Sequence, residues 1–583
     1  MLRLFKLLTK KEWLFVFLTA GFVVVSVWLD LKLPSYMSEI TQKLYTGVNW
    51  QDLIAPGGMM LLCAVCSGIA SVFAALFVAQ VAGGFGAKLR ESVYKKVLGF
   101  SQNEINKFST SSLITRTTND VTQIQMLVSF GLVVLVRAPV TAIWALSIIL
   151  TKSWQWTALV GGAVLALIVT VLVLMIVVLP KYRKVQTLTD NLNRSARENL
   201  NGMRVVRAFN ASKYQEEKFK RANNDITNNQ LFINKSMALM LPFMSLLARA
   251  LSLGIYWLGA GIIQSAGTVI EKATLFGDMV VFMSYAMQLV ISFIMLIVVF
   301  VMLPRALVAS KRINEVLSTN ASIVSGQGVK PNEVMGKLEF ANVSFKYPNA
   351  EKYILKDINF TLNRGQTLAV IGSTGCGKST LVNLIPRLYD ATEGAVKLDD
   401  VDVRDYTLAQ LNTKVAYVSQ KPILFSGTIK ENLSYGDSLG DESEDALNQA
   451  LEIAQATEFV SKLPNGLNSL LNQGGVNLSG GQKQRLNIAR AIARKPELIV
   501  FDDSFSALDY QTDKNLRNAL KTHLKDTTCV IVAQRISTIK DADVILVLDQ
   551  GRVVGQGTHK KLMQDCEIYR EIALSQLSKE ELE

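Results

Sequence analysis

Cysteine and histidine are both scarce in this sequence, which has five cysteines and two histidines among 583 residues. The two cysteines that lie closest together, Cys63 and Cys66, fall in an apolar stretch with no second pair of ligands nearby. We therefore expect them to be small core residues and not a metal or redox site, which would need further ligands or a reactive environment.

Charged residues are also few, at 19% of the chain, whereas 50% of the residues are hydrophobic and the mean hydropathy is +0.27. Such a chain is too apolar to be wholly soluble and too charged to lie wholly in lipid, so we expect two unlike parts. The basic start MLRLFKLLTKKEW leads into an apolar stretch without a small-residue cleavage site. This pattern predicts a first membrane span and not a removable signal.

Six apolar stretches reach the roughly 20 residues that a helix needs to cross a bilayer. They are residues 14–33, 57–80, 130–150, 156–179, 238–264 and 276–303. The connections 83–129 and 181–235 are long, polar and basic, and they keep apolar residues at helical spacing. We expect helices that continue beyond the membrane, with both long connections and both termini in the cytoplasm of a multi-pass protein of the cell (plasma or inner) membrane.

The formal net charge is +13, which nucleic-acid binding could also explain. Because the basic residues lie between apolar spans, we interpret them as cytoplasmic loops and expect no nucleic-acid partner. Arg137 and Arg249 lie within apolar spans, where an ionisable residue is a functional candidate. Their place in the first half of outward-running spans favours side chains that reach the inner headgroups instead.

The pattern changes after Pro304. Residues 305–325 predict a basic helix that leaves the membrane and completes a transmembrane domain over residues 1–325, and residues 326–336 predict a linker. From residue 337 to residue 583, strand-like and helical patterns alternate, which predicts a second, α/β domain.

A glycine-rich loop follows the strand-like run TLAVI and precedes a helical run. It matches the pattern G-x-x-x-x-G-K-[ST] and comprises Gly372, Ser373, Thr374, Gly375, Cys376, Gly377, Lys378, Ser379 and Thr380. In such a loop the backbone N–H groups wrap the phosphates of ATP, Lys378 neutralises the β- and γ-phosphates, and the Ser379 hydroxyl binds Mg²⁺. The strand–loop–helix context argues against a chance match.

The run LIVFDDSFSALD, residues 498–509, ends its apolar part with two aspartates. Asp502 fits a further ligand of Mg²⁺. A nucleotide-hydrolysing sheet edge of this type normally carries glutamate at the place of Asp503, and aspartate is one methylene shorter. Because a misplacement of about 1 Å can cost on the order of a hundredfold in rate, we expect ATP to bind here but to be hydrolysed slowly.

The run LSGGQKQRLNIARA, residues 478–491, opens with Leu478, Ser479, Gly480, Gly481 and Gln482. Together with the glycine-rich loop it resembles the ATP-binding-cassette (ABC) family. The resemblance implies that these signature residues hold the γ-phosphate of ATP bound to a second cassette, so that the active unit is a head-to-tail dimer. It also implies a membrane α-helical domain of six transmembrane helices with long cytoplasmic extensions, followed by an α/β P-loop ATPase domain.

Other segments fit the same resemblance, which covers the whole chain. It implies that Tyr347 stacks on adenine, that Gln420 links Mg²⁺ to the membrane domain, and that residues 506–509 cross the dimer interface. Residues 108–121 and 198–209 resemble the two cytoplasmic loops of type IV ABC exporters, whose short coupling helices touch the cassettes.

Three positions depart from the family pattern. Asp503 replaces the catalytic glutamate, Gln534 stands at the place of the switch histidine, and Gln473 stands where many members have glutamate. Glutamine can hydrogen-bond a γ-phosphate but cannot exchange a proton near neutral pH. The two histidines, His523 and His559, lie outside the switch segment, so we expect neither to substitute.

Two losses at one nucleotide site beside an intact signature favour a division of roles over a slow homodimer. We interpret the chain as half of a heterodimeric, multidrug-type exporter that uses ATP and Mg²⁺, with a partner half-transporter that keeps both the glutamate and the histidine. The late spans are rich in methionine and aromatic residues, so the cargo would be apolar or amphipathic. A dedicated lipid or peptide exporter and an ATP-gated channel or regulator remain as alternatives.

Overall fold

The computed structural model describes residues 4–45, 47, 49–150, 154–330, 335–348, 350–436 and 443–576. Contacts between residues divide the chain into two compact units. The helical unit comprises Met1–Leu98 and Ser111–Thr319, and the cassette comprises Gly99–Thr110 and Asn320–Glu583. Of the expected linker, residues 331–334 lie outside the described part.

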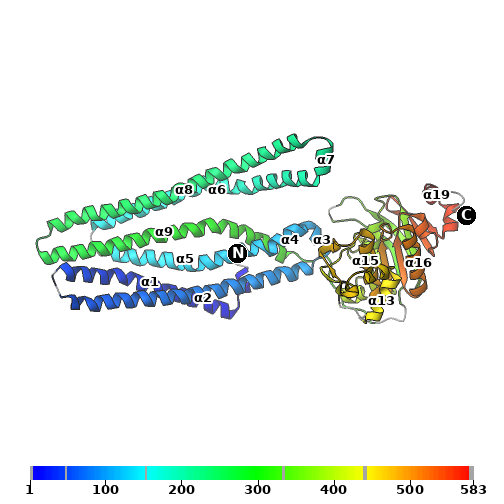
Figure 1. The fold of residues 1–583 in the computed structure, drawn as a ribbon, viewed down its shortest axis with the longest axis horizontal. Helices are drawn as coiled ribbons and strands as arrows, with labels where there is room; N and C mark the ends of the chain where they lie inside the picture. Colours follow the sequence, from blue (N-terminus) through cyan, green and yellow to red (C-terminus); the bar gives the residue numbers. More distant parts are fainter. Residues whose placement is uncertain are drawn as a thin grey trace. The chain divides into compact units, whose positions relative to one another are not determined.

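Long helices make up the helical unit (Figure 1). Among the described residues, six helices are long and apolar enough to cross a membrane, which confirms the six expected spans. They are α1 (Lys10–Tyr45), α2 (Ile54–Leu98), α5 (Asn119–Leu150), α6 (Trp154–Asn201), α8 (Ser212–Ser265) and α9 (Val269–Ser318). Each is longer than the roughly 20 residues of a span, so each extends beyond the hydrocarbon. The shorter elements are η1 (Leu4–Leu7), η2 (Trp50–Leu53), α4 (Thr110–Thr117) and α7 (Met203–Ala208).

Proline lies inside several of the long helices, at Pro34, Pro139, Pro180, Pro242 and Pro304. In a soluble helix an internal proline removes a backbone hydrogen bond and clashes with the preceding turn. Membrane helices tolerate it because neighbouring helices and local adjustments satisfy the freed carbonyl groups. The prolines are thus compatible with continuous spans.

The long helices pack in pairs around an apolar core. α1 packs mainly against α2, α5 against α9, and α6 against α8. Trp156 and Phe282 are fully buried in this core, with their ring centroids 5.3 Å apart. The buried Tyr285 donates its hydroxyl hydrogen to the carbonyl oxygen of Leu31 at 2.7 Å, so α9 is joined to α1 by a polar contact within an apolar surrounding.

An ion pair lies within the apolar stretches of the helical unit. Arg137 on α5 donates through Nη2 to Oδ2 of Asp30 on α1 at 2.8 Å. The expectation that Arg137 reaches the inner headgroups is therefore wrong, because an opposite charge on a neighbouring helix binds it inside the bundle. Arg249 on α8 is exposed, and its approach to the headgroups stays a prediction.

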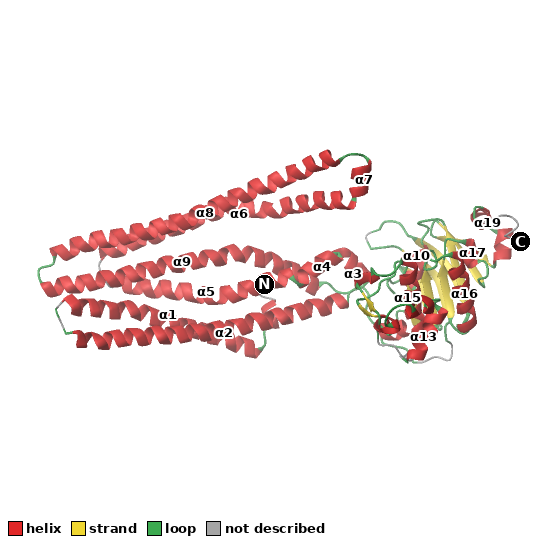
Figure 2. Ribbon diagram, in the orientation of Figure 1, coloured by secondary structure: helices red, strands yellow, loops and turns green. Residues whose placement is uncertain are grey.

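β-Sheets form the frame of the cassette (Figure 2). Among its described residues the strand orders are β2-β1-β4-β5, which is antiparallel, β12-β11-β3-β10-β9-β6, which is parallel except for β12, and β7-β8. The strands are β1 (Leu338–Phe345), β2 (Leu355–Leu362), β3 (Thr367–Gly372), β4 (Glu393–Leu398), β5 (Val401–Asp402), β6 (Val415–Val418), β7 (Gly427–Thr428), β8 (Leu470–Leu471), β9 (Leu498–Asp502), β10 (Thr528–Val532), β11 (Val544–Asp549) and β12 (Arg552–Gly557).

The parallel sheet is covered on both faces. In β9, Ile499 and Phe501 join one apolar core, while Leu498 and Val500 join the other. Burial on both faces explains why this strand is a continuous apolar run and does not alternate with polar residues. The helices of the cassette are α3 (Gln102–Phe108), α10 (Lys378–Leu384), α11 (Leu408–Lys414), α12 (Ile429–Leu433), α13 (Glu444–Ile453), α14 (Thr457–Ser461), α15 (Gly480–Ala493), α16 (Tyr510–His523), α17 (Ile536–Ile539), α18 (His559–Asp565) and α19 (Glu567–Leu574), with short turns η3 (Gly466–Asn468) and η4 (Gln473–Gly475).

A segment between α2 and α5 packs with the cassette, although we expected the first domain to run unbroken to residue 325. Its helix α3 begins with a capping box formed by Ser101 and Glu104. Glu104 Oε1 also accepts from the backbone N–H of Ser322 at 3.2 Å, and Asn106 donates to the Tyr389 hydroxyl at 3.3 Å. Burial opposes ionisation of Glu104, but the hydrogen bonds from Ser101 and Ser322 outweigh it and lower the pKa of its carboxyl. These contacts come from residues just ahead of the expected 108–121 segment.

Replacing Glu104 should loosen α3 from the rest of the cassette. In Glu104→Ala the helix loses its capping box and Ser322 loses an acceptor, at a cost of about 1 kcal/mol. We expect amide hydrogen exchange in residues 102–108 to become roughly fivefold faster. Glu104→Gln keeps an acceptor oxygen for the capping box but loses the one that accepts from Ser322, so its exchange should lie between that of the parent chain and that of Glu104→Ala. Equal exchange in the alanine variant and the parent would contradict this account.

Candidate functional site

Parallel strands of the cassette end together at one edge of the sheet. In register, Val532 of β10 lies beside Val370 of β3 and Asp502 of β9, and β6 pairs in register with β9. The loops that follow these strands carry the glycine-rich loop, the two aspartates, Gln420 and Gln534. Ligands of such sheets bind outside the carboxyl ends of the strands, so the fold gathers these residues where a ligand would lie.

The glycine-rich loop joins β3 to α10. Gly375 and Gly377 have φ angles of 85° and 105°, a region that residues with a side chain rarely adopt. A Cβ atom on Gly377 would come within 2.9 Å of a leucine side chain. Lys378 Nζ donates to the carbonyl oxygens of Gly372 and Ser373 at 2.7 and 2.8 Å. The ammonium group therefore lies against the loop, where phosphate oxygens can replace the carbonyl oxygens as acceptors.

Oxygen donors suited to a magnesium ion lie beside this loop. Ser379 Oγ donates to Oδ1 of the buried Asp502 at 2.9 Å, and the Tyr417 hydroxyl donates to Oδ2 at 2.9 Å. In the described part of the chain, no group of three or more His, Cys, Asp or Glu residues is arranged for a metal. A hydroxyl and one carboxylate nevertheless fit Mg²⁺, which commonly takes one or two protein ligands and completes its shell with water and phosphate oxygens.

Asp503 is the most constrained carboxylate of the site. Its backbone is in the left-handed region, with φ of 50°, and its N–H donates to the carbonyl oxygen of Val532 at 3.1 Å. Its side chain is buried, and its Oδ2 accepts from Gln420 Nε2 at 3.0 Å and from Gln534 Nε2 at 2.8 Å. Gln420 and Gln534, which the sequence analysis singled out, thus both bond the same oxygen of Asp503, which it also singled out.

Burial, a neighbouring charge and two hydrogen bonds act on the ionisation of the Asp503 carboxyl group. Burial raises the pKa of its carboxyl and the charge of Asp502 raises it further, whereas the hydrogen bonds from Gln420 and Gln534 act in the opposite direction. Amide groups donate a hydrogen bond but do not take up a proton near neutral pH. Of the side chains that bond Asp503 in the described structure, none can therefore receive a proton from it.

The segment after β10 is fixed by a residue near the end of the described chain. Gln576 donates through Nε2 to the carbonyl oxygen of Gln534 at 2.8 Å, and its Oε1 accepts from the N–H of Ile536 at 2.8 Å. One side chain thereby bonds the backbone on both sides of Arg535. This clamp restricts the position from which Gln534 reaches Asp503.

The signature run opens helix α15. Ser479 is the N-cap, and with Gln482 it forms a reciprocal capping box, at 3.3 and 2.9 Å. Gly480 is exposed, and a Cβ atom there would meet nothing within 4 Å. Among the described residues, no hydrogen bond joins the signature to the glycine-rich loop.

Comparison with known proteins identifies the two units. Residues 16–293 match the family described as the ABC transporter transmembrane region, and residues 355–506 match the family described as ABC transporter. A protein of Mycobacterium tuberculosis described as an uncharacterized ABC transporter ATP-binding protein is 39% identical over 95% of this chain and 94% of its own length. The chain belongs to the ABC transporter family.

Further relatives agree with this assignment. The fold of this ABC transporter chain is similar to that of a bacterial Atm1-family ABC exporter solved with ATP bound, with a TM-score of 0.76 and 24% identity, over 95% of this chain and 96% of the other. An ATP-dependent lipid A-core flippase of Pseudomonas fluorescens is 33% identical over 87% of this chain and 82% of its own length. One membrane region followed by one ATPase domain coupled to transport is the architecture of an exporter half-transporter, which confirms the resemblance seen in the sequence.

The other singled-out residues of the ABC domain lie at different places. Tyr347 is half-buried, bonds the Thr380 hydroxyl at 2.9 Å and meets the ring of Tyr389 edge-on. Gln473 is exposed in η4. His559 bonds a tyrosine hydroxyl at 2.7 Å and His523 ends α16, and neither bonds Asp503. The adenine-stacking role of Tyr347 stays a prediction.

Tyr417 is a residue that the sequence reasoning missed. Burial and the neighbouring carboxylate of Asp502 together raise the pKa of its hydroxyl, so it remains a donor at every physiological pH. It lies on β6 three residues before Gln420, and a polar tip in an otherwise apolar strand is the signal that could have indicated it. Its hydroxyl occupies the oxygen of Asp502 that Ser379 leaves free.

Asp503→Glu alone should restore little hydrolysis. The longer side chain returns about 1 Å of reach, but Gln420 and Gln534 still donate to the carboxylate and the switch position still lacks a proton-exchanging group. We expect the hydrolysis rate at this chain's site to rise less than tenfold, and to rise further in Asp503→Glu with Gln534→His. Single-turnover ATP hydrolysis measures both. Full activity in the single variant would mean that reach was the only defect.

Proposed function

We propose that this chain is one half of a heterodimeric exporter that uses ATP to move apolar and amphipathic compounds out of the cell. Its own nucleotide site would hydrolyse ATP slowly. The supporting observation is the pair of hydrogen bonds from Gln420 and Gln534 to one oxygen of Asp503. A base that is one methylene short and already accepts two amide hydrogens is poorly placed to activate a water molecule.

The signature supports the complementary half of the proposal. Ser479 and Gln482 form a complete cap at the start of α15, and Gly480 faces open space. An intact, accessible signature beside an impaired hydrolytic site fits a chain that completes its partner's site more than its own. The partner would carry, at its own nucleotide site, the glutamate and the histidine that this chain lacks. Closure of the cassettes would link the two sites.

Residues 372–380 would hold the phosphates of ATP, Tyr347 would lie against the adenine, and Ser379 with Asp502 would bind Mg²⁺. When bound, the metal would neutralise charge on the phosphates and orient them. Because the long connections of the helical unit are basic, we propose that both termini and the cassette lie on the cytoplasmic side of the cell membrane. When the two cassettes close, the contacts of α3 with the rest of its cassette would carry the movement to α2 and α5, between which α3 lies in the sequence.

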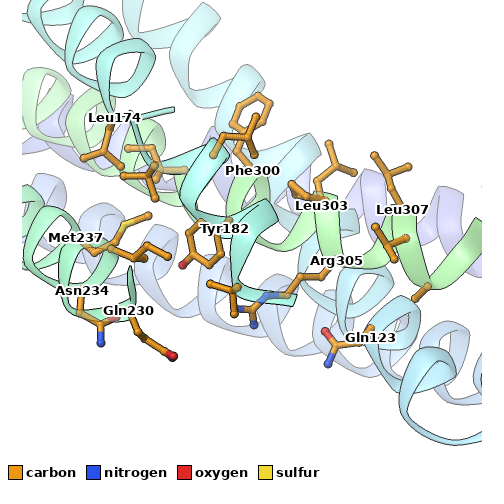
Figure 3. A pocket seen from close by; sticks show the side chains of 18 of the residues that line it. Gln123, Leu174, Tyr182, Gln230, Asn234, Met237, Phe300, Leu303, Arg305 and Leu307 are labelled. Carbon is orange, nitrogen blue, oxygen red and sulfur yellow. The ribbon is translucent and has the colours of Figure 1, made fainter. Parts of the chain in front are cut away.

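A cavity in the helical unit supports an amphipathic cargo. It measures about 1300 Å³ and lies between α5, α6, α8 and α9. Figure 3 shows apolar side chains along one side and polar side chains along the other, the apolar ones being Leu174, Phe300, Leu303 and Leu307 and the polar ones Gln123, Gln230, Asn234 and Arg305. A cavity of this size exceeds that of a typical drug-sized site, and its two unlike sides suit molecules with an apolar body and a polar head.

A dedicated lipid exporter is the second candidate. Relatives that are 32–33% identical over 87–89% of this chain include proteins named ATP-dependent lipid A-core flippase. Their cargo is also amphipathic, so the cavity between α5, α6, α8 and α9 suits this reading as well. The two candidates differ in how many kinds of molecule are moved.

Nucleotide trapping that labels each chain separately tests the division of roles. Lys378→Ala should reduce the nucleotide held by this chain more than tenfold, because it removes a phosphate counter-charge. Gly480→Asp should leave that binding intact and stop hydrolysis at the partner's site, since a side chain there meets nothing within this chain. Equal loss at both sites from either change, or brisk hydrolysis by the chain purified alone, would contradict the heterodimer.

Transport into inverted membrane vesicles separates the two kinds of cargo. Vesicles with both subunits should take up several unrelated lipophilic dyes when ATP is added. Vesicles in which the partner's catalytic glutamate is replaced by glutamine should not. If anionic lipids alone stimulate the ATPase and no dye moves, the dedicated lipid exporter is the correct reading.

A further inference from the structure

The ion pair between Asp30 and Arg137 joins three helices inside the apolar part of the helical unit. Arg137 on α5 donates to Oδ2 of Asp30 on α1 at 2.8 Å, and Oδ1 of Asp30 accepts from the Ser67 hydroxyl on α2. Asp30 lies 20 residues after the start of α1 and Arg137 lies 18 residues after the start of α5, and both fall within the apolar stretches 14–33 and 130–150. Charged residues in such places are costly and commonly mark sites of function.

The pair is open to a cavity and is not sealed by packing. The side chains of Arg137 and Asp30 are 36% and 28% exposed, and both line a cavity of about 490 Å³ between α1, α2, α5 and α9. We call this cavity the ion-pair pocket. Its other walls combine polar and soft apolar groups, chiefly Thr141, Ser284, Gln288, Met37, Met60 and Met295.

Stability alone is a weak reason to keep this pair. An ion pair in an apolar surrounding often contributes no more than apolar residues of the same volume. Arg137 has five N–H donors, and its bond to Asp30 is the only hydrogen bond that it makes within the described residues. The guanidinium therefore has donors to spare beside an accessible cavity.

We propose that the ion-pair pocket binds a zwitterionic amphiphile, with its cationic group at Asp30, its anionic group at Arg137 and its apolar part against the methionines. A ligand with a single charge would bind one partner of the pair and leave the other without an opposite charge, which lowers the net gain in binding free energy. A zwitterion replaces both halves of the pair at once. The volume suits a headgroup with a short apolar part, and methionine side chains adapt to varied shapes.

The pocket differs from the larger cavity between α5, α6, α8 and α9 in the helices that line it, since α1 and α2 replace α6 and α8. As a site for exported cargo it rests on the proposed function, whereas binding itself does not. The inference therefore predicts selectivity by charge type, measurable without ATP. Failure of transport with intact binding would count against the exporter cargo and not against the site.

Matched dodecyl amphiphiles test the proposal with the full-length chain in lipid nanodiscs. The probes are radiolabelled dodecylphosphocholine, dodecyltrimethylammonium, dodecyl phosphate and, as an uncharged reference, dodecyl maltoside. We expect dodecylphosphocholine to bind at least tenfold tighter than either dodecyltrimethylammonium or dodecyl phosphate, each of which carries charge of only one sign. Equal affinity for all of the charged probes would overturn the proposal.

Variants locate the binding. Asp30→Asn with Arg137→Gln removes both charges together, so no unpaired charge is left to disturb folding, and it should lose the preference for dodecylphosphocholine while still binding dodecyl maltoside and ATP. The control Glu39→Gln with Lys43→Gln removes a more exposed ion pair of α1 and should change nothing. If the Asp30, Arg137 double variant binds dodecylphosphocholine as the parent chain does, the site lies elsewhere.

Discussion

The parallel register of β3, β10, β9 and β6 is the constraint on which the nucleotide site depends. Backbone hydrogen bonds fix these strands side by side, so their carboxyl ends lie at one edge whatever the loops contain. The loops can then carry a lysine, a serine, two aspartates and two glutamines from positions up to 156 residues apart, as between Lys378 and Gln534. A change in any one loop alters the chemistry without altering the frame, which is how one site of a family can lose hydrolysis and keep its fold.

Much of this frame could be predicted from the sequence because its signals are local. The glycine-rich loop, the signature and the apolar spans each lie within one short run of residues, and each was found where the structure has it. The convergence of Gln420 and Gln534 on one oxygen of Asp503 could not be predicted. It depends on rotamers and on strand register, which a motif does not contain.

Contacts between distant segments were the part that sequence reasoning missed. Arg137 was expected to reach the headgroups because it lies in the first half of an outward-running span, yet Asp30 on another helix lies 2.8 Å away. Tyr417 and Asp502 are 85 residues apart and meet only because β6 and β9 are neighbours. Likewise, residues 99–110 were assigned to the membrane part by their position, whereas Glu104 and Asn106 bond cassette residues beyond residue 320.

The clamp made by Gln576 connects the end of the described chain to the nucleotide site. Its amide bonds the backbone at Gln534 and at Ile536, and the Gln534 side chain in turn bonds Asp503, so three hydrogen bonds connect Gln576 to this carboxylate. A bulky fusion attached after α19 would disturb the position of the switch segment, and a partner protein bound there would restrict its movement. The nucleotide site could thus be influenced through Gln576, from outside the site itself.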